Sequence, residues 1–163
     1  EAMAASGVDY VKVGIFPDQE LIDCIRSMTS TIIKLSVPVI AVLFADKMPS
    51  QKVIYQLKVN GFRGVMIDTA IKDGRHLLEH WGLLQLNSFI EEVTRHDMLC
   101  GLAGALRYED IGELQSLGAD YLGFRSALCK NQERTTILQV ELAAQIQQAM
   151  LSSEGGKSCQ LDE

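Results

Sequence analysis

The chain has 163 residues, a length that suits one domain with a buried core. Hydrophobic residues make up 47% and charged residues 22% of it, as in an ordinary globular protein. The net charge of −6 and the lack of a long run of Lys and Arg argue against a nucleic-acid-binding or anionic-membrane surface, while leaving room for a local basic pocket that binds phosphate.

Five apolar segments alternate with amphipathic segments along the chain. The apolar segments predict strands at 8–16, 37–45, 64–71, 98–106 and 120–128. The amphipathic segments predict helices at 17–35, 49–60, 86–96, 109–117 and 134–151, with the end of a preceding helix at 1–6. Residues 1–151 therefore form the predicted domain, and the polar residues 152–163 are predicted to be a disordered tail.

The strands begin at intervals that suit repeated βα units rather than hairpins, which predicts the α/β class with a parallel sheet. A doubly wound sheet usually carries a Gly-rich phosphate loop after its first strand, and neither GxGxxG nor GxxxxGK[ST] occurs here. Charged residues near the ends of the predicted strands instead favour a TIM (β/α)8 barrel. Five units are too few to close a barrel, and the chain starts at Glu1 within an amphipathic segment. We therefore expect the C-terminal five units of a barrel from a longer protein.

Lys12 interrupts an otherwise apolar predicted strand. Lysine is rarely buried without a partner or a function. On the inner face of a barrel, Lys12 would be available as a Schiff-base nucleophile or a general base. On an edge strand it would extend to water and have no catalytic role. We favour the catalytic role.

Asp68 and Lys72 follow the third apolar run. Their spacing of four would bring the two side chains together if the chain turned helically after Asp68. A carboxylate beside two lysines can keep one lysine protonated as an acid while the other acts as a base, which suits proton transfer next to a carbonyl group. The alternative is a helix-capping Asp68 followed by a solvent-exposed Lys72.

Small and cationic residues lie together in the last two predicted strands. The candidates for phosphate binding are Gly101, Gly104, Gly123, Arg125 and Ser126. Loops after the last strands of TIM barrels frequently bind phosphate through backbone N–H groups. Glycine permits close approach of the backbone, and an arginine adds charge-assisted hydrogen bonds. The glycines could instead mark close packing between strands.

The cysteines and histidines give no sign of a metal site. Cys24, Cys100, Cys129 and Cys159 are scattered and form no CxxC pair, so buried thiols in a reducing cytoplasm account for them more simply than zinc or disulfides. His76 and His80 have i, i+4 spacing but no third ligand motif, and we expect neither a metal nor a cofactor. No apolar run is long enough to span a membrane and no signal-peptide pattern occurs, so we expect a cytoplasmic protein.

Four segments resemble the (5-formylfuran-3-yl)methyl phosphate synthase family of methanofuran biosynthesis, whose older name is 4-(hydroxymethyl)-2-furancarboxaldehyde-phosphate synthase. They are residues 7–14 (GVDYVKVG), 66–74 (MIDTAIKDG), 101–107 (GLAGALR) and 123–129 (GFRSALC). Their order and spacing agree with the family to about residue 150, and DTAxKDG is the most specific stretch. Ser126 stands where the family has a glycine.

The resemblance implies a lysine-dependent TIM-barrel lyase that condenses two molecules of glyceraldehyde 3-phosphate into a furan, with loss of one phosphate and water. Lys12 matches the family lysine expected to act as proton acceptor, and Asp68 and Lys72 match its catalytic aspartate and second lysine. The family's Schiff-base lysine lies upstream in an Asp-x-Lys-Asn-Pro-like strand that this sequence lacks. We interpret the chain as a fragment of an active enzyme; the alternative is a truncated protein that is inactive alone.

Two other functions stay open from the sequence. One is a different Schiff-base barrel acting on sugar phosphates, such as a deoxyribose-phosphate-type aldolase, with Lys12 as the nucleophile. The other is a non-catalytic partial barrel that binds a phosphorylated ligand or a partner chain. Because an open five-stranded sheet exposes its edges, association with other chains, including a homo-oligomer, is an expectation for the fragment by itself.

Overall fold

A parallel sheet of five strands forms the centre of the computed structural model, which describes residues 1–47, 50–71 and 73–154. The strands are β1 (Val11–Gly14), β2 (Val39–Phe44), β3 (Gly64–Asp68), β4 (Leu99–Ala103) and β5 (Tyr121–Gly123). The helices are α1 (Leu21–Ile32), α2 (Lys52–Val59), α3 (Leu77–His80), α4 (Leu83–Arg95), α5 (Ile111–Ser116) and α6 (Val140–Glu154).

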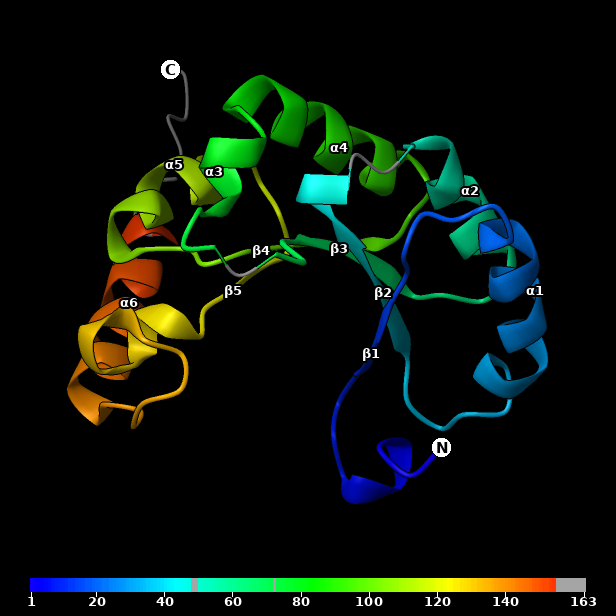
Figure 1. Cartoon of the computed structure of the whole chain (residues 1–163), viewed down its shortest axis with the longest axis horizontal. Helices are drawn as coiled ribbons and strands as arrows, with labels where there is room; N and C mark the ends of the chain where they lie inside the picture. Colours follow the sequence, from blue (N-terminus) through cyan, green and yellow to red (C-terminus); the bar gives the residue numbers. More distant parts are fainter. Residues whose placement is uncertain (48–49, 72, 155–163) are drawn as a thin grey trace, which may run out of the picture.

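The order of the strands in the sheet is the order in the chain, β1-β2-β3-β4-β5, and every neighbouring pair is parallel. The helices form an arc over one side of the sheet (Figure 1). A doubly wound sheet reverses its strand order and carries helices on both faces, whereas a TIM barrel adds strands in sequence with the helices outside. The predicted α/β class and partial TIM-barrel architecture are therefore confirmed.

The sheet is strongly curled, as a contact between side chains of its two outermost strands shows. The Nζ of Lys12 in β1 lies 5.4 Å from the centroid of the Tyr121 ring in β5. In a flat sheet, four strand spacings of about 4.8 Å would separate these two strands by roughly 19 Å. Lys12 and Tyr121 therefore meet across the concave face, which corresponds to the inside of a barrel.

Alternate residues of the strands enter two separate apolar clusters. The larger cluster packs the outer face of the sheet against the helices and includes Val39, Ala41, Leu43, Val65, Ile67, Cys100 and Leu102. The smaller cluster lies on the inner face and contains the buried residues Ile40, Val42, Met66 and Ala103. Because β2 and β3 are buried on both faces, apolar residues occupy consecutive rather than alternate positions in them.

Each long helix presents one apolar face to the sheet. In α4 the buried residues are Leu86, Phe89, Ile90 and Val93, whose spacing of three and four residues places them on the same side. Burial of each such side chain contributes about 1.5–3 kcal/mol relative to exposure. The helical period of the sequence therefore predicts both the helix and the face that packs.

The predicted strands are wrong at their carboxyl ends. β3 ends at Asp68 rather than 71, β4 ends at Ala103 rather than 106, and β5 ends at Gly123 rather than 128. After β4, Gly104 has φ of +118°, a left-handed conformation that ends the extended backbone. As a result, Gly104 and Arg125 lie in the loops that follow β4 and β5, and Ser126 begins a short 3-10 helix, so none of the three lies in a strand.

The predicted start of the last helix at 134 is wrong, because α6 begins at Val140. The hydroxyl of Thr136 donates to the carbonyl oxygens of Lys130 and Glu133, and Leu138 pairs with Cys129 in an antiparallel bridge. These contacts hold the chain in a turn before the helix. Helix α6 then extends to Glu154, so the first three residues of the predicted tail at 152–163 are helical, and 155–163 lie outside the described residues.

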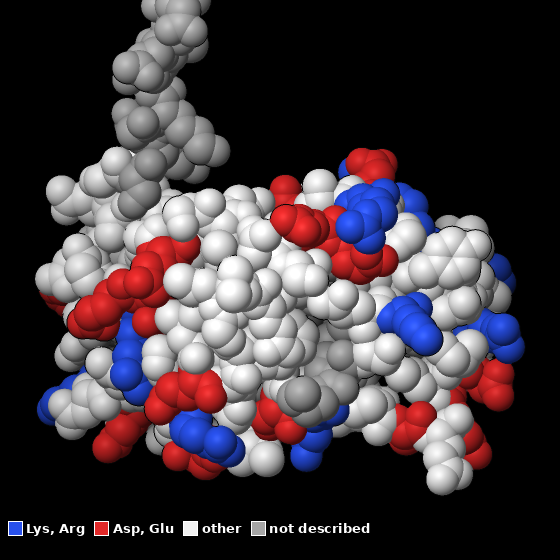
Figure 2. All heavy atoms as spheres, turned by 90° about the horizontal axis from the view of Figure 1, so that it is seen from above, with Lys and Arg blue, Asp and Glu red and all other residues white. Residues whose placement is uncertain are grey.

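Acidic and basic side chains are mixed over the surface seen in Figure 2, with an uncharged area between them. This distribution on that face agrees with the absence of a Lys/Arg run in the sequence. Among the residues that the structure describes, no helix is both long enough and apolar enough to cross a membrane.

Candidate active site

An open cavity of about 310 Å³ lies on the inner face of the sheet, toward the carboxyl ends of the strands. Its lining residues are Lys12, Val42, Met66, Asp68, Ala103, Gly104, Ala105, Gly123, Phe124, Arg125, Ser126 and Arg134. The predicted site residues among them are Lys12, Asp68, Gly104, Gly123, Arg125 and Ser126. The curled sheet thus gathers residues from β1, β3 and the loops after β4 and β5 at the edge where TIM barrels carry their chemistry.

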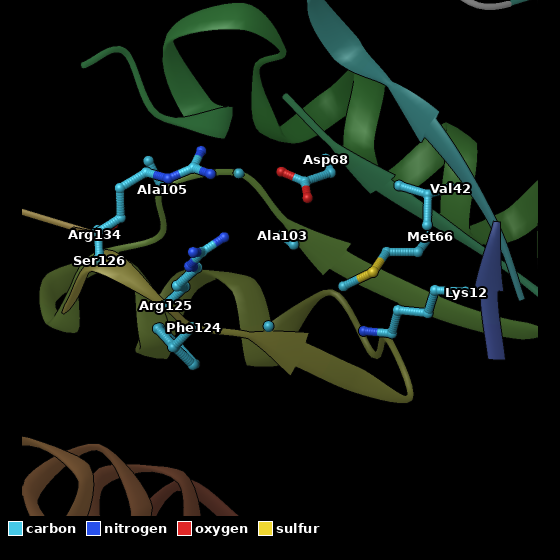
Figure 3. Close-up of a pocket in the computed structure, with 12 residues that line it drawn as sticks. Lys12, Val42, Met66, Asp68, Ala103, Ala105, Phe124, Arg125, Ser126 and Arg134 are labelled. Carbon is cyan, nitrogen blue, oxygen red and sulfur yellow. The ribbon is translucent and has the colours of Figure 1, made fainter. Parts of the chain in front are cut away.

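Lys12 reaches this cavity from the first strand. Its side chain leaves the inner face of β1 and its amino group points toward the cavity, on the side opposite Arg125 (Figure 3). The side chain is exposed in the described structure, which differs from the burial that an apolar strand suggests. The reason is that β1 is an edge strand, so no strand covers the far side of Lys12 within the described residues.

Asp68 is the last residue of β3 and is half-buried at the rim of the inner face. The backbone N–H of Thr69 donates to Asp68 Oδ1 at 2.6 Å. The segment from Thr69 to Ile71 is not helical, so the helical turn on which the predicted i, i+4 contact between Asp68 and Lys72 depends does not begin in these residues. Lys72 itself lies outside the described residues.

Asp46 fixes the segment that follows Asp68. Asp46 lies in a short 3-10 helix directly after β2, and its two carboxylate oxygens accept the backbone N–H groups of Ala70 at 2.8 Å and Ile71 at 2.7 Å. Burial raises the pKa of the Asp46 carboxyl, but these hydrogen bonds outweigh burial, so the net pKa lies below its ordinary value. The loops after β2 and β3 are thereby joined through one carboxylate.

Two arginines give the cavity a cationic wall. Arg125 follows β5 and Arg134 lies in the turn before α6, and both line the cavity with exposed side chains. Figure 3 shows the two guanidinium groups on the same side of the cavity, with the Asp68 carboxylate at its upper edge. With Lys12, three cations and one carboxylate line the cavity, an arrangement that favours an anionic ligand.

The three predicted glycines have different structural roles. A β-carbon at Gly104 would lie 2.9 Å from Thr69 Cγ2, and one at Gly123 would lie 2.8 Å from Met66 Cε, so both glycines permit close packing, and both also line the cavity. Gly101 does not line the cavity, because the Tyr121 ring covers it: a β-carbon there would lie 2.3 Å from Tyr121 Cζ. The structure therefore does not place Gly101 with the other candidates for phosphate binding.

A second cavity of about 310 Å³ adjoins the first and shares Ala105, Ser126 and Arg134 with it. It is lined in addition by Thr69, Ile71, Gly74, Arg75, Arg107, Gln132, Glu133 and Thr135. Arg75 pairs with Asp73 at 2.8 Å, and Arg107 lies 3.8 Å from Glu79. Arg134 thus lies between two adjoining spaces, both of which contain cationic side chains.

His76 connects the loops after β3 and β4. Its Nδ1 lies 3.2 Å from Asp110 Oδ2, and the same oxygen accepts the backbone N–H of Arg107 at 2.8 Å. His76 also caps α3, where Glu79 accepts the backbone N–H of His76 at 2.7 Å. Within the described part of the chain, no group of three or more His, Cys, Asp or Glu residues is arranged to hold a metal ion.

The sequence did not predict Arg134 or the hydrogen bonds of Asp46. The prediction places Arg134 at the start of the last helix, and Asp46 directly follows the predicted strand at 37–45. The position of Asp46 at the end of a barrel strand was a usable signal, because functional residues of barrels concentrate there. Nothing local to Arg134 distinguishes it from a solvent-exposed helix residue.

The sequential parallel sheet and the cationic cavity at its carboxyl edge define the chain as part of a TIM-barrel protein. A solved structure titled "Native KDPGal structure" agrees with this fold: it superposes with a TM-score of 0.57 at 15% identity, over 94% of this chain and 62% of that one. At that identity the similarity concerns the fold alone.

The family is identified by sequence comparison. The profile of the 4-HFC-P synthase family matches residues 1–147, and the chain belongs to this family. The (5-formylfuran-3-yl)methyl phosphate synthase of Methanococcus maripaludis is 33% identical over 139 residues, which cover 79% of this chain and 59% of that protein. The synthase of Methanopyrus kandleri is 30% identical over 145 residues, covering 81% and 60%. The chain therefore spans about three fifths of the length of these relatives.

Proposed function

We propose that this chain forms part of a lyase that condenses two molecules of glyceraldehyde 3-phosphate into (5-formylfuran-3-yl)methyl phosphate, with loss of one phosphate and water. The observation that carries the proposal is that Lys12, Asp68, Arg125 and Arg134 all line the same cavity. Family membership supports the reaction, because its curated members bear the name of this synthase. The pathway is methanofuran biosynthesis.

Within this proposal Lys12 accepts a proton from the carbon next to the substrate carbonyl. Asp68, at the end of β3, belongs to the same cavity and assists proton transfer together with Lys72. A positioned acid or base contributes about a hundredfold to ten-thousandfold to a rate. In the family resemblance the Schiff-base lysine lies in an Asp-x-Lys-Asn-Pro-like strand that these residues do not contain, so the proposal assigns acid/base chemistry and phosphate binding to this chain.

Phosphate binding rests on Arg125, Arg134 and the backbone beside Gly104, Gly123 and Ser126. The adjoining cavity, with Arg75 and Arg107, has room for a second phosphorylated molecule next to the first. Arg134 lines both cavities and can contact either phosphate. Two adjoining cationic spaces suit a reaction in which two phosphorylated aldehydes combine and one phosphate departs.

The test is an assay of the full-length natural protein with glyceraldehyde 3-phosphate, following inorganic phosphate and the furan aldehyde by ultraviolet absorbance and mass. Lys12→Ala and Asp68→Asn should each lower turnover by at least about a hundredfold. Lys34→Ala, a change at an exposed lysine remote from the cavity, is the matched control and should leave turnover unchanged. Full activity of Lys12→Ala would contradict the proposal.

Borohydride trapping distinguishes the proposed role of Lys12 from the aldolase alternative. If Lys12 accepts a proton, reduction in the presence of glyceraldehyde 3-phosphate should label a lysine outside this chain. A label on the peptide that contains Lys12 would instead identify it as the nucleophile. Absence of both label and turnover in the full-length protein would favour a non-catalytic barrel that binds a phosphorylated ligand.

A further inference from the structure

The carboxylate of Asp46 holds two consecutive peptide groups in the loop after β3. Oδ1 accepts the N–H of Ala70 at 2.8 Å, and Oδ2 accepts the N–H of Ile71 at 2.7 Å. Hydrogen bonds to a charged acceptor are stronger than neutral ones, and two on adjacent residues fix the orientation of both peptide planes. Asp46 therefore constrains backbone dihedrals within the loop as well as the loop's distance from β2.

The constrained peptides follow the proposed acid/base residue Asp68 in the chain. Residues 69–71 belong to neither a helix nor a strand, so no regular backbone ladder fixes their N–H groups. On the other side of the loop, Gly104 approaches the Thr69 backbone so closely that a β-carbon would lie 3.2 Å from Thr69 N. The loop is thus held between the backbone at Gly104 and the side chain of Asp46.

Acid/base catalysis requires the reacting groups to be held within about 0.5 Å of the productive geometry. Asp46 fixes the backbone at Ala70 and Ile71, two and three residues after Asp68. We propose that Asp46 is a positioning residue, which fixes the backbone that follows Asp68 for proton transfer at the Asp68 carboxylate. This inference rests on the proposed function for its catalytic consequence and on the hydrogen bonds for its structural one.

Asp46→Asn tests the inference while changing little in shape. An Asn side chain offers one acceptor oxygen and an NH₂ group that cannot accept, so at most one of the two loop N–H groups keeps its partner. The matched control is Asp120→Asn, because Asp120 Oδ2 accepts the backbone N–H of Cys100 at 2.6 Å at the amino end of β4, away from the candidate active-site cavity. Both variants remove one negative charge and weaken a hydrogen bond between a side chain and the backbone.

The first readout needs no activity: amide hydrogen exchange at Ala70 and Ile71 in the full-length natural protein. Asp46→Asn should speed exchange at one or both amides by about tenfold, whereas Asp120→Asn should leave both unchanged. Unchanged exchange at both amides in Asp46→Asn would overturn the inference, because it would show that Asp46 does not hold the loop.

The second readout separates positioning from a general loss of stability. In the condensation assay, Asp46→Asn should lower kcat by about tenfold or more with KM for glyceraldehyde 3-phosphate within about twofold, and Asp120→Asn should change neither. Faster exchange with an unchanged kcat would overturn the catalytic role. If the unmodified protein does not convert glyceraldehyde 3-phosphate at all, the proposed function fails, and the exchange result alone decides whether Asp46 holds the loop.

Discussion

The ring of Tyr121 lies directly over the α-carbon of Gly101, on the neighbouring strand of the sheet. Gly101 and Tyr121 are register partners in β4 and β5, and a β-carbon on Gly101 would lie 2.3 Å from Tyr121 Cζ. The missing side chain leaves the space through which the ring extends along the inner face toward Lys12. Gly101 therefore serves the packing that brings β1 and β5 together across the inner face.

Gly101→Ala should destabilise the fold by about 1–3 kcal/mol, because the added methyl group must displace a large ring in a packed sheet. Urea unfolding should show a lower midpoint with an unchanged slope. Gly112→Ala is the control, since Gly112 lies in α5 with no atom within 4 Å of the added β-carbon. In a Tyr121→Ala background the cost of Gly101→Ala should largely disappear, and equal costs in both backgrounds would show that the ring is not the cause.

Arg134→Ala should weaken the binding of inorganic phosphate by about tenfold, because a charge-assisted hydrogen bond to phosphate contributes on the order of 1.5 kcal/mol. Calorimetric titration at low ionic strength measures the affinity. Arg95→Ala is the matched control: Arg95 is an exposed arginine on α4 that pairs with Glu92 and does not line the cavity. If both variants bound phosphate as the unmodified chain does, Arg134 would have no part in the anion site.

Much of the fold is predictable because it depends on local patterns. Gly7, Gly61 and Gly118 follow helical segments and have positive φ values of 84°, 90° and 78°, the conformation for which glycine is preferred after a helix. Consecutive apolar residues predict strands buried on both faces, as in β2 and β3. Lys12 and Asp68, which line the cavity, are also predictable from a local pattern. Each is a polar residue in or at the end of an otherwise apolar strand.

Other features depend on contacts between distant segments and leave no local sign. The last predicted strand continues to 128 because FRSAL is as apolar as the strand before it, yet the chain turns into a 3-10 helix at Ser126. Asp46 hydrogen-bonds residues 24 and 25 positions later in the chain. Arg134 lines the cavity because the turn around Thr136 delays the start of α6. Such tertiary hydrogen bonds determine the site, and a local period cannot reveal them.

The contribution of Asp46 to stability should depend on pH. Its folded-state pKa lies below the ordinary value of about 3.9, because burial raises it but the hydrogen bonds from the Ala70 and Ile71 N–H groups lower it by more. A lowered carboxyl pKa stabilises the folded state above the unfolded pKa, and that stability is lost as the pH falls through the folded pKa.

Urea unfolding of the unmodified chain and Asp46→Asn between about pH 3 and pH 7 measures this dependence. The two free energies of unfolding should differ by on the order of 1 kcal/mol near neutral pH, since the carboxylate is partly exposed to solvent. The difference should shrink as the pH falls below about 4. A difference of constant size over the whole range would exclude the charge of Asp46 as its origin.

Cys100 should resist alkylation in the folded protein, because its thiol is buried. Burial raises the pKa of the Cys100 thiol to about 12, and the charge of Asp120 acts in the same direction. Because the thiolate is the reactive form, roughly one Cys100 thiol in ten thousand is ionised at pH 8, against about a quarter of the thiols with an ordinary pKa near 8.5.

Cys24 is exposed and serves as the internal control. Iodoacetamide followed by peptide mass spectrometry should label Cys24 at least about a hundredfold faster than Cys100 in the native state, and both at similar rates in guanidinium chloride. Equal native rates would mean that the outer face of β4, and with it the helix α4 that covers it, opens freely to solvent.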